Sequence, residues 1–157
     1  MKNYQIEAKD GTKHWISRST AVAAMIETSD DYILVVKRGK GAASHQGLWC
    51  LPCGYLDYGE TLKEACAREL LEETNLCIST SCLHLCEIDD DPTNFNQNIS
   101  VIFYATLSVP HEYCDAISAG TGGEPDEIEQ AIWLPISEVD SLDFAFGHDE
   151  LIKEEYW

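Results

Sequence analysis

The segment from Thr61 to Thr74 restricts the fold more than any other part of this chain, because its composition favours only a helix. It is built from good helix formers and contains no Gly or Pro. Thr61, with Glu64 three residues later, matches the capping box that begins many helices. A helix of this kind buries one face against another element, so the residues on that face indicate what the rest of the chain must accommodate.

Three carboxylates occupy the face of this helix that should be buried. At about 100° per residue, Glu69, Glu72 and Glu73 share an arc of about 100° on its last turns. The arc continues the stripe of residues that the first half of the helix turns inward, namely Leu62, Ala65 and Cys66. One interpretation is a solvated acidic face. Their position on the inward stripe favours a second interpretation, in which the three carboxylates bind a hard divalent cation such as Mg²⁺. Without such a cation, carboxylates in this position would become protonated or destabilise the fold.

The rest of the chain alternates short apolar runs with turn residues, which predicts strands. The expected extended segments are Thr20–Glu27 and Tyr32–Lys37, joined as a hairpin, then Leu76–Ile88, Asn98–Val109 and Glu127–Leu134, and a short apolar piece lies at Leu48–Leu51. Short helices are expected at Ser137–Ser141 and Asp149–Tyr156, and residues 1–19 are expected to form an irregular lead-in or a short edge strand. The fold class is therefore α/β or α+β, with helices packed on one sheet.

Length and charge limit the functions open to the chain. Its 157 residues suit a single domain over 1–157, and its formal net charge is −18. So acidic a surface repels nucleic-acid polymers and anionic membranes, so neither is an expected partner, and a small anionic substrate would need a cation. The sequence shows no secretory signal and no apolar run long enough to span a bilayer, which predicts a cytoplasmic protein.

The seven cysteines include two short spacings that deserve separate interpretation. Cys50 and Cys53 form a CxxC pair, and Cys82 and Cys86 flank His84. A structural zinc site is one interpretation, but no second CxxC at the spacing of a zinc finger follows. Small buried thiols are the favoured alternative.

The residues around the helix resemble a known family motif. Gly54, five residues, Glu60, seven residues and then Arg68-Glu69-Leu70-Leu71-Glu72-Glu73-Thr74-Asn75-Leu76 resemble the Nudix box, GX5EX7REUXEEXGU. Asn75 stands where the family has Gly, and Asn is the usual second choice where a helix ends in a left-handed residue. The preceding segment 46–52 resembles the family's lead-in, with Cys53 in place of a frequent Gly.

This resemblance implies a Nudix-type mixed β-sheet sandwiched between helices. It also implies a hydrolase that uses Mg²⁺, or Mn²⁺, to cleave a pyrophosphate bond in a nucleoside diphosphate linked to another moiety. The metal ligands carried over from the family are the Gly54 carbonyl and the carboxylates of Glu69, Glu72 and Glu73.

The resemblance also assigns catalytic positions. Arg68 would orient a box glutamate, and Glu60 would be an outer carboxylate that fixes the loop. The residue that takes the proton from water varies in the family; Glu73 and the acids of segment 124–129, Glu127 first, are the candidates, and Glu72 also belongs to the catalytic set.

Substrate contacts are less defined by the sequence. Arg38 at the end of a strand is a candidate for binding phosphate, although an ordinary surface arginine explains it equally well. Tyr55 and Phe95 are candidates for stacking on a base, as are Phe144 and Phe146, with plain packing as the alternative.

The likeness extends loosely to one substrate class. Pro92, sixteen residues past Leu76, and the tail 143–152 resemble features of ADP-ribose-type members, so a small nucleotide such as ADP-ribose is the expected substrate. A non-catalytic, nucleotide-sensing domain of the same fold is the alternative. Homodimers are common among relatives, which leaves a homodimer open.

Overall fold

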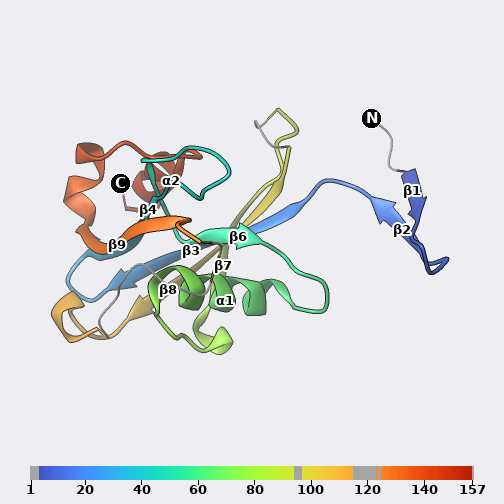
Figure 1. Cartoon of the computed structure of the whole chain (residues 1–157). Coiled ribbons are helices and arrows are strands. Elements are labelled where there is room, and N and C mark those ends of the chain that lie inside the picture. Colours follow the sequence, from blue (N-terminus) through green and yellow to red (C-terminus); the bar gives the residue numbers. More distant parts are fainter. Residues whose placement is uncertain (1–3, 94–96, 115–122, 124, 157) are drawn as a thin grey trace.

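The computed structural model describes residues 4–93, 97–114, 123 and 125–156 (Figure 1). The strands are β1 (Tyr4–Glu7), β2 (Lys13–Ile16), β3 (Thr20–Thr28), β4 (Tyr32–Arg38), β5 (Trp49–Cys50), β6 (Cys53–Tyr55), β7 (His84–Asp89), β8 (Ile99–Leu107) and β9 (Ile128–Pro135). The helices are α1 (Leu62–Thr74) and α2 (His148–Tyr156), with 3₁₀ turns η1 (Thr80–Cys82), η2 (His111–Tyr113) and η3 (Ile136–Ser141). Among these described residues, no helix has the length and apolarity that a membrane span requires.

Strand β3 is the centre of the main sheet. It runs parallel to β8 along its whole length, from Thr20 opposite Ile99 to Thr28 opposite Leu107. On its other side it pairs antiparallel with β6, and it meets β4 only at Glu27 opposite Ile33. The predicted hairpin of β3 and β4 is therefore confirmed, but the two strands diverge and let β6 in between. The neighbours run β5-β4-β3-β8-β7, with β9 on β4, so the sheet is mixed as expected.

The two faces of β3 pack against different helices because successive side chains in a strand alternate. Val22, Ala24 and Ile26 belong to the same core cluster as Leu70 of α1. The alternate residues of β3 belong to a second cluster with η3 and α2. Figure 1 shows α1 and α2 on opposite sides of the sheet. The sheet is thus sandwiched between helices, which confirms the predicted fold class.

Two expectations about local structure are wrong. The lead-in is not irregular, because β1 and β2 form a separate antiparallel pair of short strands, with Tyr4 opposite Ile16. The segment after α1 is not extended throughout, because η1 interrupts it and β7 begins only at His84. Burial of Leu76 and Leu83 in the core beneath α1 imposes this bend, and alternation along the sequence carries no sign of it.

Candidate active site

Helix α1 is fixed at both ends by contacts that the sequence anticipates. The Thr61 hydroxyl accepts a hydrogen bond from the Glu64 N–H at 3.3 Å, and the Glu64 carboxylate accepts one from the Thr61 N–H at 2.7 Å. Asn75 ends the helix in the left-handed region, with φ of 60°, and donates its N–H to the Leu71 carbonyl at 3.0 Å. These caps set where the helix starts and stops, and hence where its carboxylates lie.

The box carboxylates lie on the inward stripe of α1. Glu73 is 3% exposed, and the side chains of Glu69 and Glu72 are 14% and 29% exposed. Glu73 accepts a hydrogen bond from the Cys53 N–H at 2.9 Å. Burial raises the pKa of Glu73 well above its usual range, and it also raises the pKa of Glu69. These residues are therefore not a solvated acidic face.

Arg68 links the loop before the helix to the carboxylates on it. Its guanidinium donates to both carboxylate oxygens of Glu60, at 2.7 and 3.0 Å. It also donates to Glu69 at 2.7 Å, to Glu72 at 3.2 Å and to the Tyr55 carbonyl at 2.9 Å. The fork of the guanidinium suits this set of acceptors, and its hydrogen bonds lower the pKa of Glu60. Arg68 thus compensates part of the negative charge and orients Glu69.

Gly54 faces the Glu69 carboxylate at a distance that leaves no room for a side chain. A Cβ placed on Gly54 would lie 2.1 Å from Glu69 Oε1 and 2.2 Å from Glu69 Cδ. The backbone of β6 and the carboxylates of α1 are therefore in direct apposition. Backbone carbonyl and carboxylate oxygens are the donors that Mg²⁺ takes, so Gly54 and the three box glutamates are of the donor type that a hard divalent cation binds.

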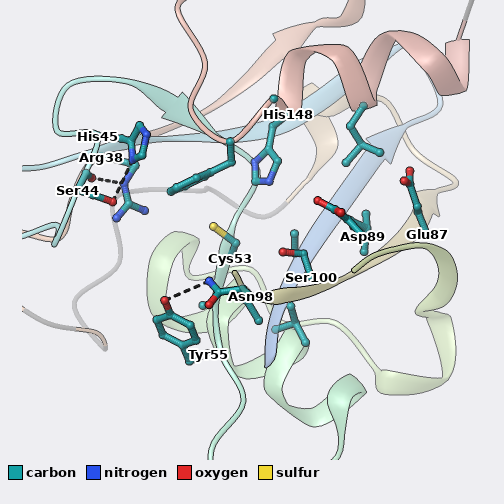
Figure 2. A pocket seen from close by; sticks show the side chains of 18 of the residues that line it. Arg38, Ser44, His45, Cys53, Tyr55, Glu87, Asp89, Asn98, Ser100 and His148 are labelled. Atoms are coloured by element: carbon teal, nitrogen blue, oxygen red, sulfur yellow. Dashed lines mark hydrogen bonds between the residues drawn. The ribbon is translucent and has the colours of Figure 1, made fainter. Parts of the chain in front are cut away.

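A cavity of about 600 Å³ lies beside this cluster, and Gly54 and Cys53 belong to its wall. Its other walls come from β3, β7, β8, the loop 43–45 and the segment 146–154. Figure 2 shows Arg38, Ser44 and His45 on one side of it and Glu87 and Asp89 on the opposite side. Arg38 and the acids of β7 therefore lie on opposite sides of the cavity.

Two of the predicted site residues reach this cavity from the end near β9. Arg38 is 6% exposed, donates Nε–H to the Ser44 carbonyl at 2.8 Å and lies 5.2 Å from the centroid of the Phe146 ring. Arg38 is therefore no ordinary surface residue. Glu127 also lines the cavity, and its charge contributes to the raised pKa values of Glu69 and Glu73. The carbonyl of Glu127 accepts the Gly39 N–H at 2.6 Å, which anchors this acid to the end of β4.

The predicted aromatic contacts separate into three cases. Tyr55 lines the cavity, is 53% exposed and accepts a hydrogen bond from the Asn98 side chain at 3.2 Å. Phe146 lines the cavity as well, whereas Phe144 packs against the core. Phe95 lies outside the described residues.

Sequence reasoning missed His148, which lines the cavity at the start of α2. Its Nδ1 accepts a hydrogen bond from the Leu51 N–H at 3.0 Å, and burial lowers its pKa from 6.5 to about 4. His148 is therefore a neutral acceptor at pH 7. The sequence shows one histidine beside Gly147, and no local pattern connects it with Leu51.

The cysteine pairs remain without a complete set of metal ligands in the part of the chain that is described. The Cys50 thiol, with burial, raises the pKa of Cys53, so these two thiols are close, and Cys86 donates to Glu155 at 3.2 Å. No three His, Cys, Asp or Glu side chains of the described residues converge as they would around a metal ion. This includes the box glutamates, two of which are paired with Arg68 instead.

Comparisons with known proteins agree with the motif. A family model described as the NUDIX domain matches residues 17–154. The ADP-ribose pyrophosphatase of Methanocaldococcus jannaschii is 29% identical over 95% of this chain and 80% of its own length. Nudix hydrolase 2 of Arabidopsis thaliana is 24% identical over 86% of this chain, which spans 45% of that protein.

Solved structures show the same fold. A bifunctional NMN adenylyltransferase/ADP ribose pyrophosphatase of Francisella tularensis, complexed with AMP and a Mn ion, has a TM-score of 0.73 at 24% identity, over 88% of this chain and 41% of its own. The NUDIX domain of Shewanella oneidensis NrtR, complexed with ADP ribose, has a TM-score of 0.70 at 22% identity, over 89% and 87%. The chain therefore belongs to the NUDIX family of pyrophosphohydrolases.

Proposed function

We propose that this protein uses Mg²⁺ or Mn²⁺ to hydrolyse the pyrophosphate bond of a nucleoside diphosphate linked to another moiety, with ADP-ribose or a close analogue as substrate. The burial of Glu73 beside Glu69, against a glycine that also walls a cavity, carries this proposal. A fold gains no stability from two crowded inward acids, so their placement points to a cation as their partner.

The residues that would hold the cation are the Gly54 carbonyl, Glu69, Glu72 and Glu73. A bound Mg²⁺ or Mn²⁺ supplies charge neutralisation at the diphosphate oxygens and lowers the pKa of water. Arg68 holds the Glu69 carboxylate against Gly54, and the Cys53 N–H holds that of Glu73. These contacts fix the positions of the Glu69 and Glu73 carboxylates on the inward side of the helix.

Glu127 is the first candidate for the group that takes the proton from the attacking water. It lines the cavity, whereas Glu73 is almost wholly buried and already accepts the Cys53 N–H. A general base must reach the proton that it removes, and this requirement favours Glu127. Glu72 and Glu73 then act through the cation.

The cavity fits a dinucleotide-sized substrate better than a single phosphate. Its volume of about 600 Å³ lies within the roughly 300–1,000 Å³ of small-molecule sites. Arg38 at one end is placed for a phosphate, and Tyr55 offers a ring for the base. Similarity to an ADP-ribose pyrophosphatase along 95% of the chain supports ADP-ribose in particular.

The test is hydrolysis of a panel with Mg²⁺ or Mn²⁺: ADP-ribose, NADH, a nucleotide sugar, a diadenosine polyphosphate and oxidised dGTP. Chromatography would follow AMP or other monophosphate products, and H₂¹⁸O would show which phosphorus is attacked. We expect the wild-type protein to release AMP from ADP-ribose. A chelator should abolish this release, and so should the substitution Glu73→Gln. Glu64→Gln is the matched control, because it removes a charge from the same helix and keeps the capping box.

The alternative is a nucleotide-sensing domain. ADP-ribose that binds in calorimetry without release of any product, from any compound of the panel and with either metal, would contradict the hydrolase proposal and favour that alternative.

A further inference from the structure

Arg38 carries a buried positive charge that no described carboxylate compensates. It is 6% exposed, and its side chain makes one hydrogen bond to a described residue, from Nε–H to the Ser44 carbonyl at 2.8 Å. None of the ion pairs among the described residues includes it. A buried charge costs free energy unless an opposite charge or further hydrogen bonds compensate it. The Nη groups of Arg38 are therefore available to a ligand at the cavity wall.

The ring of Phe146 lies over this guanidinium. The Arg38 Cζ is 5.2 Å from the ring centroid, which is within the range of a cation–π contact. His45 packs on the same ring, with the two ring centroids 4.8 Å apart. The guanidinium is thus held at Nε by the Ser44 carbonyl and at its face by Phe146. Because the group is planar, these two contacts together restrict the directions in which its Nη groups can donate.

The backbone of Phe146 has a conformation that a bulky side chain normally avoids. Its φ is 65°, in the left-handed region. The chain is fixed on both sides of it, because the Ala145 N–H donates to the Trp49 carbonyl at 2.8 Å and His148 Nδ1 accepts from the Leu51 N–H at 3.0 Å. Strain of this kind persists only where the surrounding structure imposes it, and it is frequent at ligand sites. The fold therefore accepts a cost in order to keep this ring over Arg38.

We propose that Phe146 is a positioning residue, whose ring orients the Arg38 guanidinium so that its Nη groups bind a phosphate of the substrate. The inference rests on the proposed function, which brings a diphosphate to Arg38. It assigns the ring to the arginine and not to the base of the nucleotide, for which Tyr55 is the candidate. Figure 2 shows Tyr55 apart from Arg38 and His45. Loss of the Phe146 ring should therefore weaken the binding of a diphosphate whether or not it carries a base.

The test is isothermal titration calorimetry with Mg²⁺ and two diphosphates that resist hydrolysis. One is the α,β-methylene analogue of ADP-ribose, which carries a base, and the other is methylenediphosphonate, which carries none. Phe146→Leu should weaken the binding of both ligands by about tenfold, because a cation–π contact with a desolvated guanidinium is lost. Phe146→Tyr keeps the ring face and should bind both ligands as the wild type does. Tyr55→Leu should weaken only the ligand with the base.

The matched control is Phe144→Leu, the same change two residues earlier. Phe144 packs against the core and is not among the described residues that line the cavity, so this variant should bind both ligands as the wild type does.

A double-mutant cycle with Arg38 separates positioning from a purely structural role. Arg38→Gln should weaken both ligands by about tenfold or more, and Phe146→Leu should then add less than about twofold, because the group that it orients is gone. Urea denaturation shows whether each variant is folded. If leucine at position 146 prevents folding, Phe146→Gly takes its place, since glycine adopts the left-handed conformation freely and still removes the ring.

Three results in these variants would overturn the inference: unchanged affinity in Phe146→Leu, a loss confined to the ligand with the base, or an equal loss with and without the Arg38 side chain. Failure of the wild type to bind either diphosphate would overturn it as well. The hydrolysis panel decides the proposed function separately. A protein that shows the expected losses of binding but releases no product would contradict hydrolysis and leave the role of Phe146 intact.

Discussion

Gly54→Ala tests the apposition of β6 and α1 directly. Gly54 does not have a positive φ, so alanine can adopt its backbone conformation without strain. The cost of the substitution is therefore steric and comes from one neighbour, the Glu69 carboxylate, which supplies all three of the nearest atoms.

The size of the effect follows from that geometry. The new Cβ would lie 2.1 Å from Glu69 Oε1, and an ordinary contact begins at 3.4 Å, so the carboxylate has to move by about 1.3 Å. A movement of this size breaks its 2.7 Å hydrogen bond from Arg68, which is a charge-assisted bond worth about 1.5–3 kcal/mol. Alanine also lowers the entropy of the unfolded chain, which returns about 0.4–1 kcal/mol. We expect a net loss of about 1–2 kcal/mol in the free energy of unfolding.

The sign should reverse when the neighbour is removed. In a Glu69→Ala background, the clash disappears and Gly54→Ala should stabilise by about 0.4–1 kcal/mol. Urea denaturation followed by the fluorescence of the four tryptophans measures all four corners of this double-mutant cycle. Gly59→Ala is the matched control: its φ is +89° with open space around it, so it should cost about 1–2 kcal/mol in both backgrounds.

An equal cost of Gly54→Ala with and without Glu69 would refute the reasoning, because it would show that the glycine is needed for something other than that carboxylate. A coupling energy above the roughly 0.5 kcal/mol expected of independent sites is required.

Three further predictions concern pH and metal. Burial raises the pKa of Glu73 above its usual 4.5, so the folded protein keeps the proton of this carboxyl group to higher pH than the unfolded chain does. The free energy of unfolding of the metal-free protein should therefore fall as pH rises above 4.5. Urea titrations of Glu73→Gln should not show that decline, and the variant should be as stable as the wild type or slightly more stable. The pKa of His148 is lowered from 6.5 to about 4, so the free energy of unfolding should fall by about 3 kcal/mol as pH drops from 6.5 to 4. His148→Gln should remove this loss, whereas the control His84→Asn, at an exposed histidine, should keep it. Mn²⁺ or Mg²⁺ at a hundred times its Kd should raise the free energy of unfolding by about 2.7 kcal/mol in the wild type, and a similar gain in Glu73→Gln would contradict the ligand assignment.

The box helix could be predicted from sequence because its information is local. The capping residues, the absence of Gly and Pro and the 3.6-residue stripe all lie within Thr61–Thr74, and the structure places Ala65, Cys66 and Glu73 inside as the stripe requires. The conflict between an inward position and a charge was visible in the same pattern. A motif that breaks a local rule is often functional, and here the break gave the position of the candidate site.

The cavity could not be predicted, because its walls come from segments that sequence patterns do not connect. The parallel pairing of β3 with β8 joins residues about eighty positions apart, and it sets Ser100 and Ile102 on the cavity wall beside Ala21 and Ala23. His148 acquires its role only through the Leu51 N–H, 97 positions away. Each of these residues is ordinary in its local context, so only the tertiary structure reveals the set.

The charges of the cavity set a condition on how this acidic protein would accept the proposed anionic substrate. Among the described residues that line it, Arg38 is the one Lys or Arg, whereas Glu87, Asp89, Glu127 and two acids of α2 contribute negative side chains. One guanidinium does not balance a diphosphate and these carboxylates together. In the proposed function, a cation held by the box glutamates would supply the remaining compensation and would also bind phosphate oxygens of the substrate. Binding of cation and substrate should therefore be coupled, each raising the affinity of the other by the same factor, because such coupling is reciprocal.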